Sequence, residues 1–328
     1  MSTAASLGFS EHTTEANGIE IHWVEVGEGP LVVFCHGWPE SWYSWRHQLP
    51  VVAEAGFRAV AMSMRGYGGT SAPQDVAAYS MSHLIGDVVG VVNALGGGRA
   101  VVVGHDWGAP VAWYSGLMRP DLFRAVAALS VPLPPPIGAL PEGVTMTALM
   151  EANAGPDREY YRLFFAEPGV AEADFEADID RSMRGLLCSI SGAGRQEWDG
   201  HWPKGETMTQ QFEIPDELPP WLSEADLAFF VAEMTRTGFR GGFNWYRNID
   251  ALPAILAPWV GQTVRQPVLY MAGTSDLLAG NTPDNLDIVR GLPDLRHFEL
   301  VDDVGHWIQQ EAPERVNDAL VSFLHGLD

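Results

Sequence analysis

Apolar and polar positions along the first 130 residues follow two different periods. Short, continuous apolar runs are typical of strands buried on both faces, and the longer segments between them carry apolar residues at helical spacing. Residues 19–26 mostly alternate between apolar and polar, which predicts a half-buried antiparallel strand. Strands that alternate with helices predict right-handed crossovers and a mainly parallel sheet. We expect further strands at residues 31–34, 57–64, 100–103 and 123–129, and helices at 41–53, at 82–95 and through Met118.

This alternation stops at a cluster of prolines. The prolines at positions 132 and 134–136 can continue neither a strand nor a helix, so they predict a linker. Residues 140–248 are then expected to form helical segments, rich in acidic and aromatic residues and without clear strands. Strands at 267–271 and 296–300 and helices at 285–290 and 313–324 restore the first pattern. We therefore expect an α/β core formed by residues 1–132 and 255–328, interrupted by a helical cap at residues 133–254.

Composition limits the partners of such a domain. The chain has 328 residues, and its 19 basic residues stand against 42 acidic ones for a net charge of -23. So large an acidic excess argues against nucleic acid or an anionic membrane as a partner and favours a neutral or cationic small molecule. No window approaches the ~18 consecutive apolar residues of a membrane span. Cys35 and Cys188 are too few for a disulfide framework, so we expect a reducing, cytoplasmic setting.

Residues 104–108, Gly-His-Asp-Trp-Gly, lie between an expected buried strand and an expected helix. This is the pattern of a nucleophile elbow, in which two glycines allow strand and helix to approach closely and Asp106 occupies the apex of the turn. A carboxylate can displace at a strained or activated carbon and form a covalent ester. Asp is also a favoured helix N-cap, so this motif alone leaves a merely capping role for Asp106 open.

Two further residues at strand ends favour the catalytic interpretation. In α/β folds with such an elbow, the catalytic triad follows the chain order nucleophile, acid, histidine. Asp276 and His306 each follow an expected strand, in that order. Either residue alone could belong to an ordinary turn or helix start. Because all three fall at the same edge of a parallel sheet, we predict a triad of Asp106, Asp276 and His306, with Asp276 orienting the imidazole.

Backbone N–H groups beside these residues are candidates for an oxyanion hole. The N–H of Trp107 lies at a helix N-terminus, and that of Trp38 lies in the loop after the strand at 31–34. We expect both groups to stabilise the negative oxygen that forms during hydrolysis. His36 and His105 are adjacent to turn residues rather than at an apex, so structural roles are expected for them.

Four motifs together resemble those of one known family. They are HGWPES at 36–41, RGYGGTSAP at 65–73, GHDWG at 104–108 and DVGHW at 303–307. From about Gly18 onward the chain resembles the α/β-hydrolase-fold epoxide hydrolases, including the hydrolase domain of the soluble enzyme and its bacterial and plant relatives. The resemblance implies an α/β-hydrolase fold, with a mainly parallel sheet, helices on both faces and an inserted helical cap.

Two segments of the expected cap strengthen this resemblance. Residues 161–170 and 243–248 are similar to the segments that carry the family's two ring-opening tyrosines, which match Tyr161 and Tyr246. A phenol is a hydrogen-bond donor at pH 7 and can protonate a leaving alkoxide. Aromatic residues of a cap can also be simple core, which is the role we expect for Tyr160. Ala166 stands where members of the family often carry glutamine.

The resemblance implies an epoxide hydrolase that converts an epoxide to a vicinal diol. Asp106 would form an alkyl-enzyme ester, and water activated by His306 would hydrolyse that ester. The implied substrate is a small, neutral, largely apolar epoxide, with water as the second reactant. No cofactor, metal, nucleic acid or membrane is implied, and a homodimer is compatible with the pattern.

Two other functions stay open on the sequence alone. A haloalkane dehalogenase shares the fold, the Asp nucleophile, the His base and even an Asp-Trp-Gly elbow, but it binds a halide with a Trp pair or an Asn/Trp pair and lacks the cap tyrosines. Trp107 could serve a halide, whereas Trp38 replaces the Asn often found after His-Gly. A non-enzymatic binding module of the same fold would be favoured by loss of a triad member, and none is missing.

Overall fold

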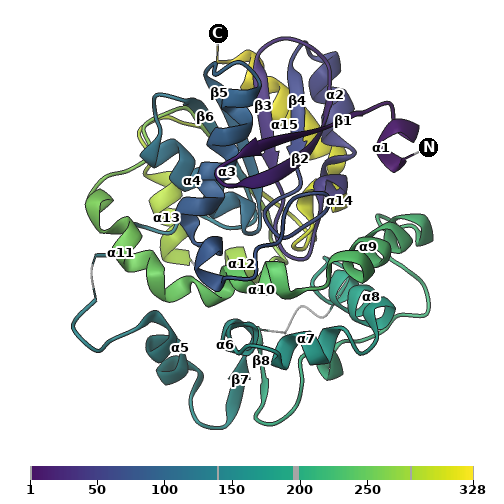
Figure 1. The fold of residues 1–328 in the computed structure, drawn as a ribbon, viewed down its shortest axis with the longest axis vertical. Coiled ribbons are helices and arrows are strands. Elements are labelled where there is room, and N and C mark those ends of the chain that lie inside the picture. Colours follow the sequence, from purple (N-terminus) through teal and green to yellow (C-terminus); the bar gives the residue numbers. More distant parts are fainter. Residues whose placement is uncertain (1, 139, 195–198, 281–282, 328) are drawn as a thin grey trace.

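An eight-stranded sheet forms the centre of the protein (Figure 1). The structure, a computed structural model, describes residues 2–138, 140–194, 199–280 and 283–327. Strand β2 pairs antiparallel with both β1 and β4, and the other neighbouring strands pair in parallel. In spatial order the strands are β1 (Ser10–Ala16), β2 (Ile19–Val26), β4 (Arg58–Met62), β3 (Leu31–Cys35), β5 (Ala100–His105), β6 (Phe123–Leu129), β9 (Val268–Gly273) and β10 (Leu295–Val301).

Successive side chains of the central strands enter two separate hydrophobic cores. In β5, Val102 packs into the core that contains α3 (Met81–Ala94) and α4 (Gly108–Met118), whereas Val101 and Val103 pack into the core that contains α2 (Gln48–Glu54) and α15 (Pro313–His325). A strand has a side-chain period of two, so one continuous run of valines fills both cores. The shorter helices outside the segment between β6 and β9 are α1 (Thr3–Ser6), α12 (Leu277–Gly280), α13 (Pro283–Arg290) and α14 (Ile308–Glu311), and α11 (Leu252–Leu256) lies late in that segment.

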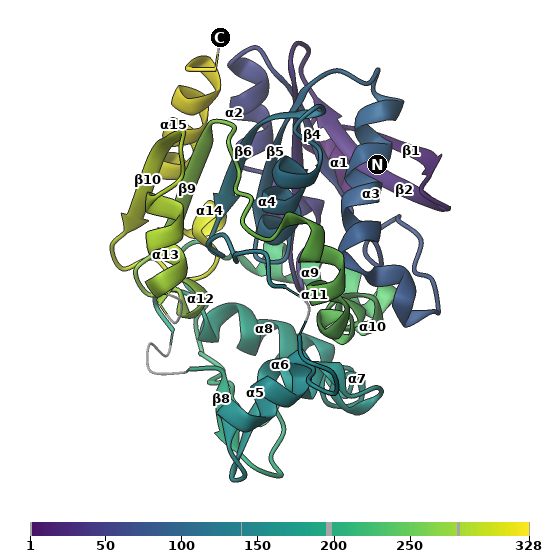
Figure 2. The same ribbon diagram turned by 90° about the vertical axis from the view of Figure 1, so that its left-hand side faces the viewer.

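The residues between β6 and β9 form a separate, mainly helical layer below the sheet (Figure 2). Because β6 and β9 are hydrogen-bonded neighbours, the chain leaves the sheet at one point and returns beside it. No helix in the described ranges is long and apolar enough to cross a membrane. The helices of this layer are α5 (Met146–Ala154), α6 (Tyr161–Ala166), α7 (Val170–Phe175), α8 (Ile179–Ser189), α9 (Glu224–Thr237) and α10 (Arg240–Arg247).

The structure differs from the sequence-based expectations in several local respects. The inserted layer, expected to lack strands, contains a small antiparallel pair, β7 (Arg158–Tyr160) and β8 (His201–Pro203). Strand β1 was not expected, because it is a mostly exposed edge strand of polar residues with no apolar alternation to reveal it. The helix expected at 41–53 divides into a short 3₁₀ turn, Trp42–Trp45, and α2.

The inserted layer contacts the core directly, at loops that follow the carboxyl ends of strands. The Trp245 indole N–H donates to the Arg65 carbonyl at 3.2 Å. Beside this bond Gly66 meets Gly241 so closely that a Cβ on Gly241 would lie 2.6 Å from the Gly66 carbonyl oxygen. On the other side, the N–H of His306 donates to the Ile190 carbonyl at 2.9 Å. The layer therefore holds two of the loops that follow core strands.

A buried ion pair fixes one of these loops. Arg65 donates to both carboxylate oxygens of Asp87 at 2.6 and 2.8 Å, and Asn17 donates to Asp87 at 2.7 Å. The side chains of Arg65 and Asp87 are 2% and 1% exposed, so neither charge is solvated by water.

We predict that Asp87→Ala lowers the free energy of unfolding by about 3–5 kcal/mol, because it leaves the Arg65 cation buried without its partner. Urea denaturation followed by circular dichroism measures the change. As a control, Asp287→Ala removes one partner of the exposed Arg290–Asp287 pair and should cost less than about 1 kcal/mol. Equal effects of the two substitutions would contradict a stabilising role for the buried pair.

Candidate active site

Asp106 lies at the turn between β5 and α4, in a backbone conformation that L-residues seldom adopt. Its φ is +50°. Strand and helix approach so closely here that a Cβ on Gly104 would lie 1.9 Å from the Gly108 carbonyl oxygen, and a Cβ on Gly108 would lie 2.0 Å from the Cys35 carbonyl oxygen. Both glycines of the motif are therefore required by packing. The strained turn raises the Asp106 side chain above the end of the sheet.

Two backbone N–H groups face the Asp106 carboxylate. The N–H of Trp38 donates to Asp106 Oδ1 at 2.7 Å, and the N–H of Trp107 favours the charged form of the carboxylate. A Cβ on Gly37 would lie 2.3 Å from the same oxygen, so this loop also needs glycine to approach. Burial raises the pKa of Asp106, while His306, His105 and the two N–H groups partly offset burial by favouring the charged form.

His306 lies between the two acidic residues of the expected triad. Its Nε2 is 3.6 Å from Asp106 Oδ2, and its Nδ1 is 3.2 Å from Asp276 Oδ1. The N–H of Leu278 also donates to Asp276 Oδ1, at 2.9 Å, which fixes the carboxylate on the imidazole. The structure thus brings together all three residues that the sequence assigned to the triad.

Ser130 is a fourth residue at this point that the sequence did not reveal. It follows β6 with a φ of +71°, and its hydroxyl lies 3.1 Å from His306 Nδ1. A hydrogen bond from the same hydroxyl helps to lower the pKa of Asp276. The phenol of Tyr270 donates to the Ser130 carbonyl at 2.7 Å and holds this turn. A serine after a buried strand is too common for sequence to single it out.

The charges around His306 favour its protonated form. Burial lowers the pKa of the imidazole, but the carboxylates of Asp276, Asp106 and Glu40 outweigh burial and raise it to about 9. Burial likewise works against the Asp276 carboxylate, yet His306 lowers the pKa of that group overall. In the free protein the imidazole therefore sits as a cation between two carboxylates at neutral pH.

Glu40 joins the loop that carries Trp38 to the histidine loop. Its carboxylate accepts the N–H of Gly37 at 2.8 Å, lies 2.8 Å from His105 Nδ1 and accepts the side-chain amide of Gln309 at 2.9 Å. His105 Nε2 in turn lies 2.7 Å from the His306 carbonyl. Glu40 and His105 thus fix the loop that carries Trp38 and the loop that carries His306 relative to each other. Sequence reasoning missed Glu40, because nothing in the HGWPES motif shows that its glutamate points inward.

The expected ring-opening tyrosines face each other across the site. Tyr161 begins α6 and Tyr246 lies near the end of α10, with ring centroids 6.2 Å apart. Both are buried, at 8% and 4% exposure. Burial raises the pKa of both phenols, so each keeps its proton at neutral pH and can donate a hydrogen bond.

Two cavities meet at these residues. The larger has a volume of about 360 Å³ and the smaller about 40 Å³, and Asp106, Tyr161, Tyr246 and Leu278 line both. Trp38, Leu186, Ile190 and Met208 line the smaller one beside His306. The larger one is walled mainly by apolar side chains, among them Pro134, Ile137, Met146, Met150, Ile249 and Leu256. Such an arrangement suits a largely apolar small molecule whose reacting atoms lie between Asp106 and the two phenols.

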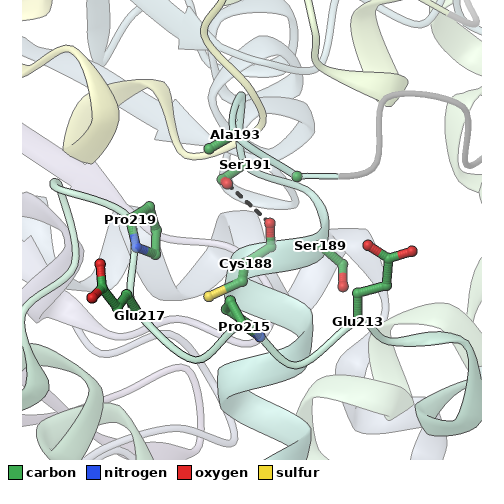
Figure 3. Close-up of a pocket in the computed structure, with 9 residues that line it drawn as sticks. Cys188, Ser189, Ser191, Ala193, Glu213, Pro215, Glu217 and Pro219 are labelled. Carbon is green, nitrogen blue, oxygen red and sulfur yellow. Dashed lines mark hydrogen bonds between the residues drawn. The ribbon is translucent and has the colours of Figure 1, made fainter.

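A third cavity, of about 230 Å³, lies beside the end of α8, and it shares no lining residue with the two cavities above (Figure 3). Cys188 lies in its wall between Glu213 and Glu217, and Ser191 donates to the Cys188 carbonyl at 2.9 Å. Burial raises the pKa of the Cys188 thiol to about 11, so the thiol is protonated at neutral pH. Within the described part of the chain, no group of three or more His, Cys, Asp or Glu side chains could hold a metal ion.

Comparisons with known proteins identify the family of the chain. Residues 30–313 match the family model described as alpha/beta hydrolase fold, and the chain belongs to that family.

Similar proteins within the family include epoxide hydrolases. The chain is 40% identical to epoxide hydrolase A of Mycobacterium tuberculosis over 326 residues, covering 97% of this chain and 98% of that protein. A solved epoxide hydrolase from an endophytic Streptomyces is 42% identical, with a TM-score of 0.93 over 98% of this chain and 96% of that one. Epoxide hydrolase A from Mycobacterium thermoresistibile is 39% identical, with a TM-score of 0.89 over 98% and 99% of the two chains. The protein is therefore an enzyme of the epoxide hydrolase family.

The charge pattern predicts how the pKa of His306 responds to substitution. Asp106→Asn and Asp276→Asn each remove a carboxylate that favours the imidazolium, so each should lower the pKa of His306, and Asp276→Asn should lower it more because its contribution is the larger. Titration of the imidazole by NMR measures both shifts. Asp303→Asn, an exposed change in the same loop, is the control and should leave the titration unchanged. An unshifted titration in both site variants would contradict the electrostatic picture.

Proposed function

We propose that the protein hydrolyses epoxides to vicinal diols through an ester formed on Asp106. The observation that carries this proposal is the convergence of two phenols and one carboxylate on the same cavities, with Tyr161 and Tyr246 opposite Asp106. A carboxylate that attacks carbon and phenols that stabilise the leaving oxygen are the groups that opening of a neutral three-membered ring requires. Residues 133–254 are proposed to act as the cap that brings these phenols to the site.

In the first step, Asp106 attacks one ring carbon while the other carbon keeps the oxygen. Tyr161 and Tyr246 donate hydrogen bonds to that oxygen as its carbon–oxygen bond breaks, which stabilises charge that develops only in the transition state. The turn that strains Asp106 also fixes the direction of its carboxylate, so the attacking oxygen is already oriented before the substrate binds. The product of this step is a hydroxyalkyl ester of Asp106.

In the second step, His306 deprotonates the water that attacks this ester. Esterification removes the negative charge of Asp106, and with it one of the charges that raise the pKa of His306. The imidazole therefore becomes easier to deprotonate once the ester has formed, which readies it as a base for this step. Asp276 stabilises the imidazolium that then forms, and the N–H groups of Trp38 and Trp107 stabilise the tetrahedral oxyanion.

The proposed substrate is a neutral, largely apolar epoxide, consistent with the mainly apolar walls of the larger cavity. We place the protein in the cytoplasm because Cys35 and Cys188 are both free and buried. A haloalkane dehalogenase remains the second candidate, on the Asp106–His306–Asp276 geometry that the two reactions share. The indole of Trp107 packs edge-to-face against the Tyr246 ring, with ring centroids 5.0 Å apart, and the two cap phenols beside it favour an alkoxide over a halide as the leaving group.

Isotope labelling tests the ester. We expect a single turnover of the enzyme in ¹⁸O-water to yield diol without label, because the added oxygen comes from Asp106. Mass spectrometry of the diol measures the label, and Asp106→Asn should give no diol. Label in the first diol would point to direct attack by water. Release of bromide from a bromoalkane at a rate above diol formation would instead favour the dehalogenase.

Replacing the base should separate the two steps. His306→Gln should still open the ring, because a carboxylate needs no base, but ester hydrolysis should slow by about 10²–10⁴-fold. Intact-protein mass spectrometry should then show an adduct equal in mass to the epoxide. The double variant Asp106→Asn/His306→Gln is the matched control and should carry no adduct. If His306→Gln binds the substrate but carries no adduct, His306 would also be needed for ring opening.

A further inference from the structure

The two site phenols are held by chemically different partners. The Nε–H of Arg162 donates to the oxygen of Tyr161 at 2.8 Å, and its guanidinium carbon lies 5.5 Å from the centre of the Tyr161 ring. The ring of Tyr246 instead packs edge-to-face against the neutral indole of Trp107, with ring centroids 5.0 Å apart. Tyr161 therefore accepts a hydrogen bond from a cation and keeps its own proton free to be donated, whereas Tyr246 has a neutral neighbour.

Among the residues that the structure describes, the guanidinium of Arg162 has no acidic partner. Its side chain is half-buried in the wall of the larger cavity, beside Tyr161 and Tyr246. Among the residues that the structure describes, no carboxylate lies within 4.0 Å of its guanidinium, whereas Arg158 and Arg247 of the same layer are paired with Asp199 and Glu172. A partly buried cation without a counter-ion is costly, which indicates that its charge serves the site.

We propose that Arg162 is a positioning residue that makes Tyr161 the proton donor in ring opening, while Tyr246 only donates a hydrogen bond. This inference rests on the proposed epoxide hydrolysis and assigns different roles to its two phenols. The guanidinium holds the Tyr161 oxygen in place and stabilises the phenolate that proton transfer leaves behind.

The protons balance over the cycle. As Asp106 forms its bond to carbon, the electron pair of the breaking carbon–oxygen bond stays on the ring oxygen, which takes the Tyr161 proton and becomes the first hydroxyl. Tyr161 is then a phenolate beside Arg162. Once the ester has formed, the His306 cation loses its proton to solvent. Hydrolysis of the ester then adds water, gives the second hydroxyl and restores the Asp106 carboxylate, and His306 keeps the proton that it takes from water. Uptake of a proton from solvent by the Tyr161 phenolate closes the cycle.

The groups that face Tyr161 give the sign of the Arg162 effect. Burial raises the pKa of Tyr161 most, Tyr160 and the Asp106 carboxylate raise it further, and Arg162 lowers it through its charge and its hydrogen bond. Tyr246 lies opposite, with its ring 6.2 Å away. Removing Arg162 should therefore raise the pKa of Tyr161 and weaken it as an acid.

A double-mutant cycle tests the proposal. Arg162→Met should slow single-turnover ring opening by roughly 10- to 100-fold, the range expected for a hydrogen bond to a charged group. It should have the same effect in a Tyr246→Phe background, but less than about a twofold effect in a Tyr161→Phe background, where its target is gone. Equal slowing in both backgrounds, or no slowing in either, would overturn the proposal.

Spectroscopy gives a second readout that needs no turnover. The ultraviolet titration of tyrosinate, taken as the difference between each protein and its Tyr161→Phe counterpart, should move to higher pH in Arg162→Met. Arg162→Lys keeps the charge and should move the tyrosinate titration less. It also serves as the test variant if Arg162→Met folds poorly. Arg158→Met removes a cation four residues away, at an exposed pair, and should leave both readouts unchanged. An unshifted titration overturns the role of Arg162, whereas a shifted one in a protein that opens no epoxide refutes the proposed function instead.

Discussion

The site depends on holding a carboxylate in a place from which water is largely excluded. Asp106 is buried at a turn with positive φ, and three glycines around it, Gly37, Gly104 and Gly108, leave no room for a Cβ. Such close packing is what allows backbone N–H groups to reach the carboxylate, and these donors together with His306 replace the lost hydration. The same turn that allows these donors to reach the carboxylate also points the Asp106 side chain into the cavity. The backbone strain at Asp106 is therefore tied to the position of its carboxylate.

The charges form one coupled set rather than separate pairs. Asp276, Asp106 and Glu40 all act on His306, and the imidazole in turn favours the ionised form of Asp106. Two of these carboxylates keep their charge throughout the proposed cycle, while Asp106 loses its charge when it becomes an ester. In that proposed cycle the pKa of His306 falls when Asp106 becomes an ester, so the first step would itself prepare His306 to act as the base.

Sequence alone predicted the residues whose local pattern is specific. The elbow around Asp106, the chain order of the triad and the valine run of β5 each reflect a steric or periodic requirement that few sequences meet by accident. The roles given to these residues stay predictions. Strand β1 escaped prediction because it is polar and exposed, and Ser130, Glu40 and Arg162 escaped because their contacts join segments far apart in the chain or depend on side-chain direction. Common residue types without a periodic pattern become informative only in three dimensions.

The inserted layer does more than cover the cavity, because it also holds the loop that carries the proposed base. Glu311 accepts the N–H groups of Gly305 and Trp307, on either side of His306, and that of Gly192 after α8, at 2.7 to 3.1 Å. The N–H of His306 itself donates to Ile190 of the same segment. A change in the position of α8, whose residue Leu186 lines the smaller cavity, would therefore move His306 as well. Because one segment lines the smaller cavity and fixes the imidazole, the proposed mechanism links substrate preference to the rate of ester hydrolysis.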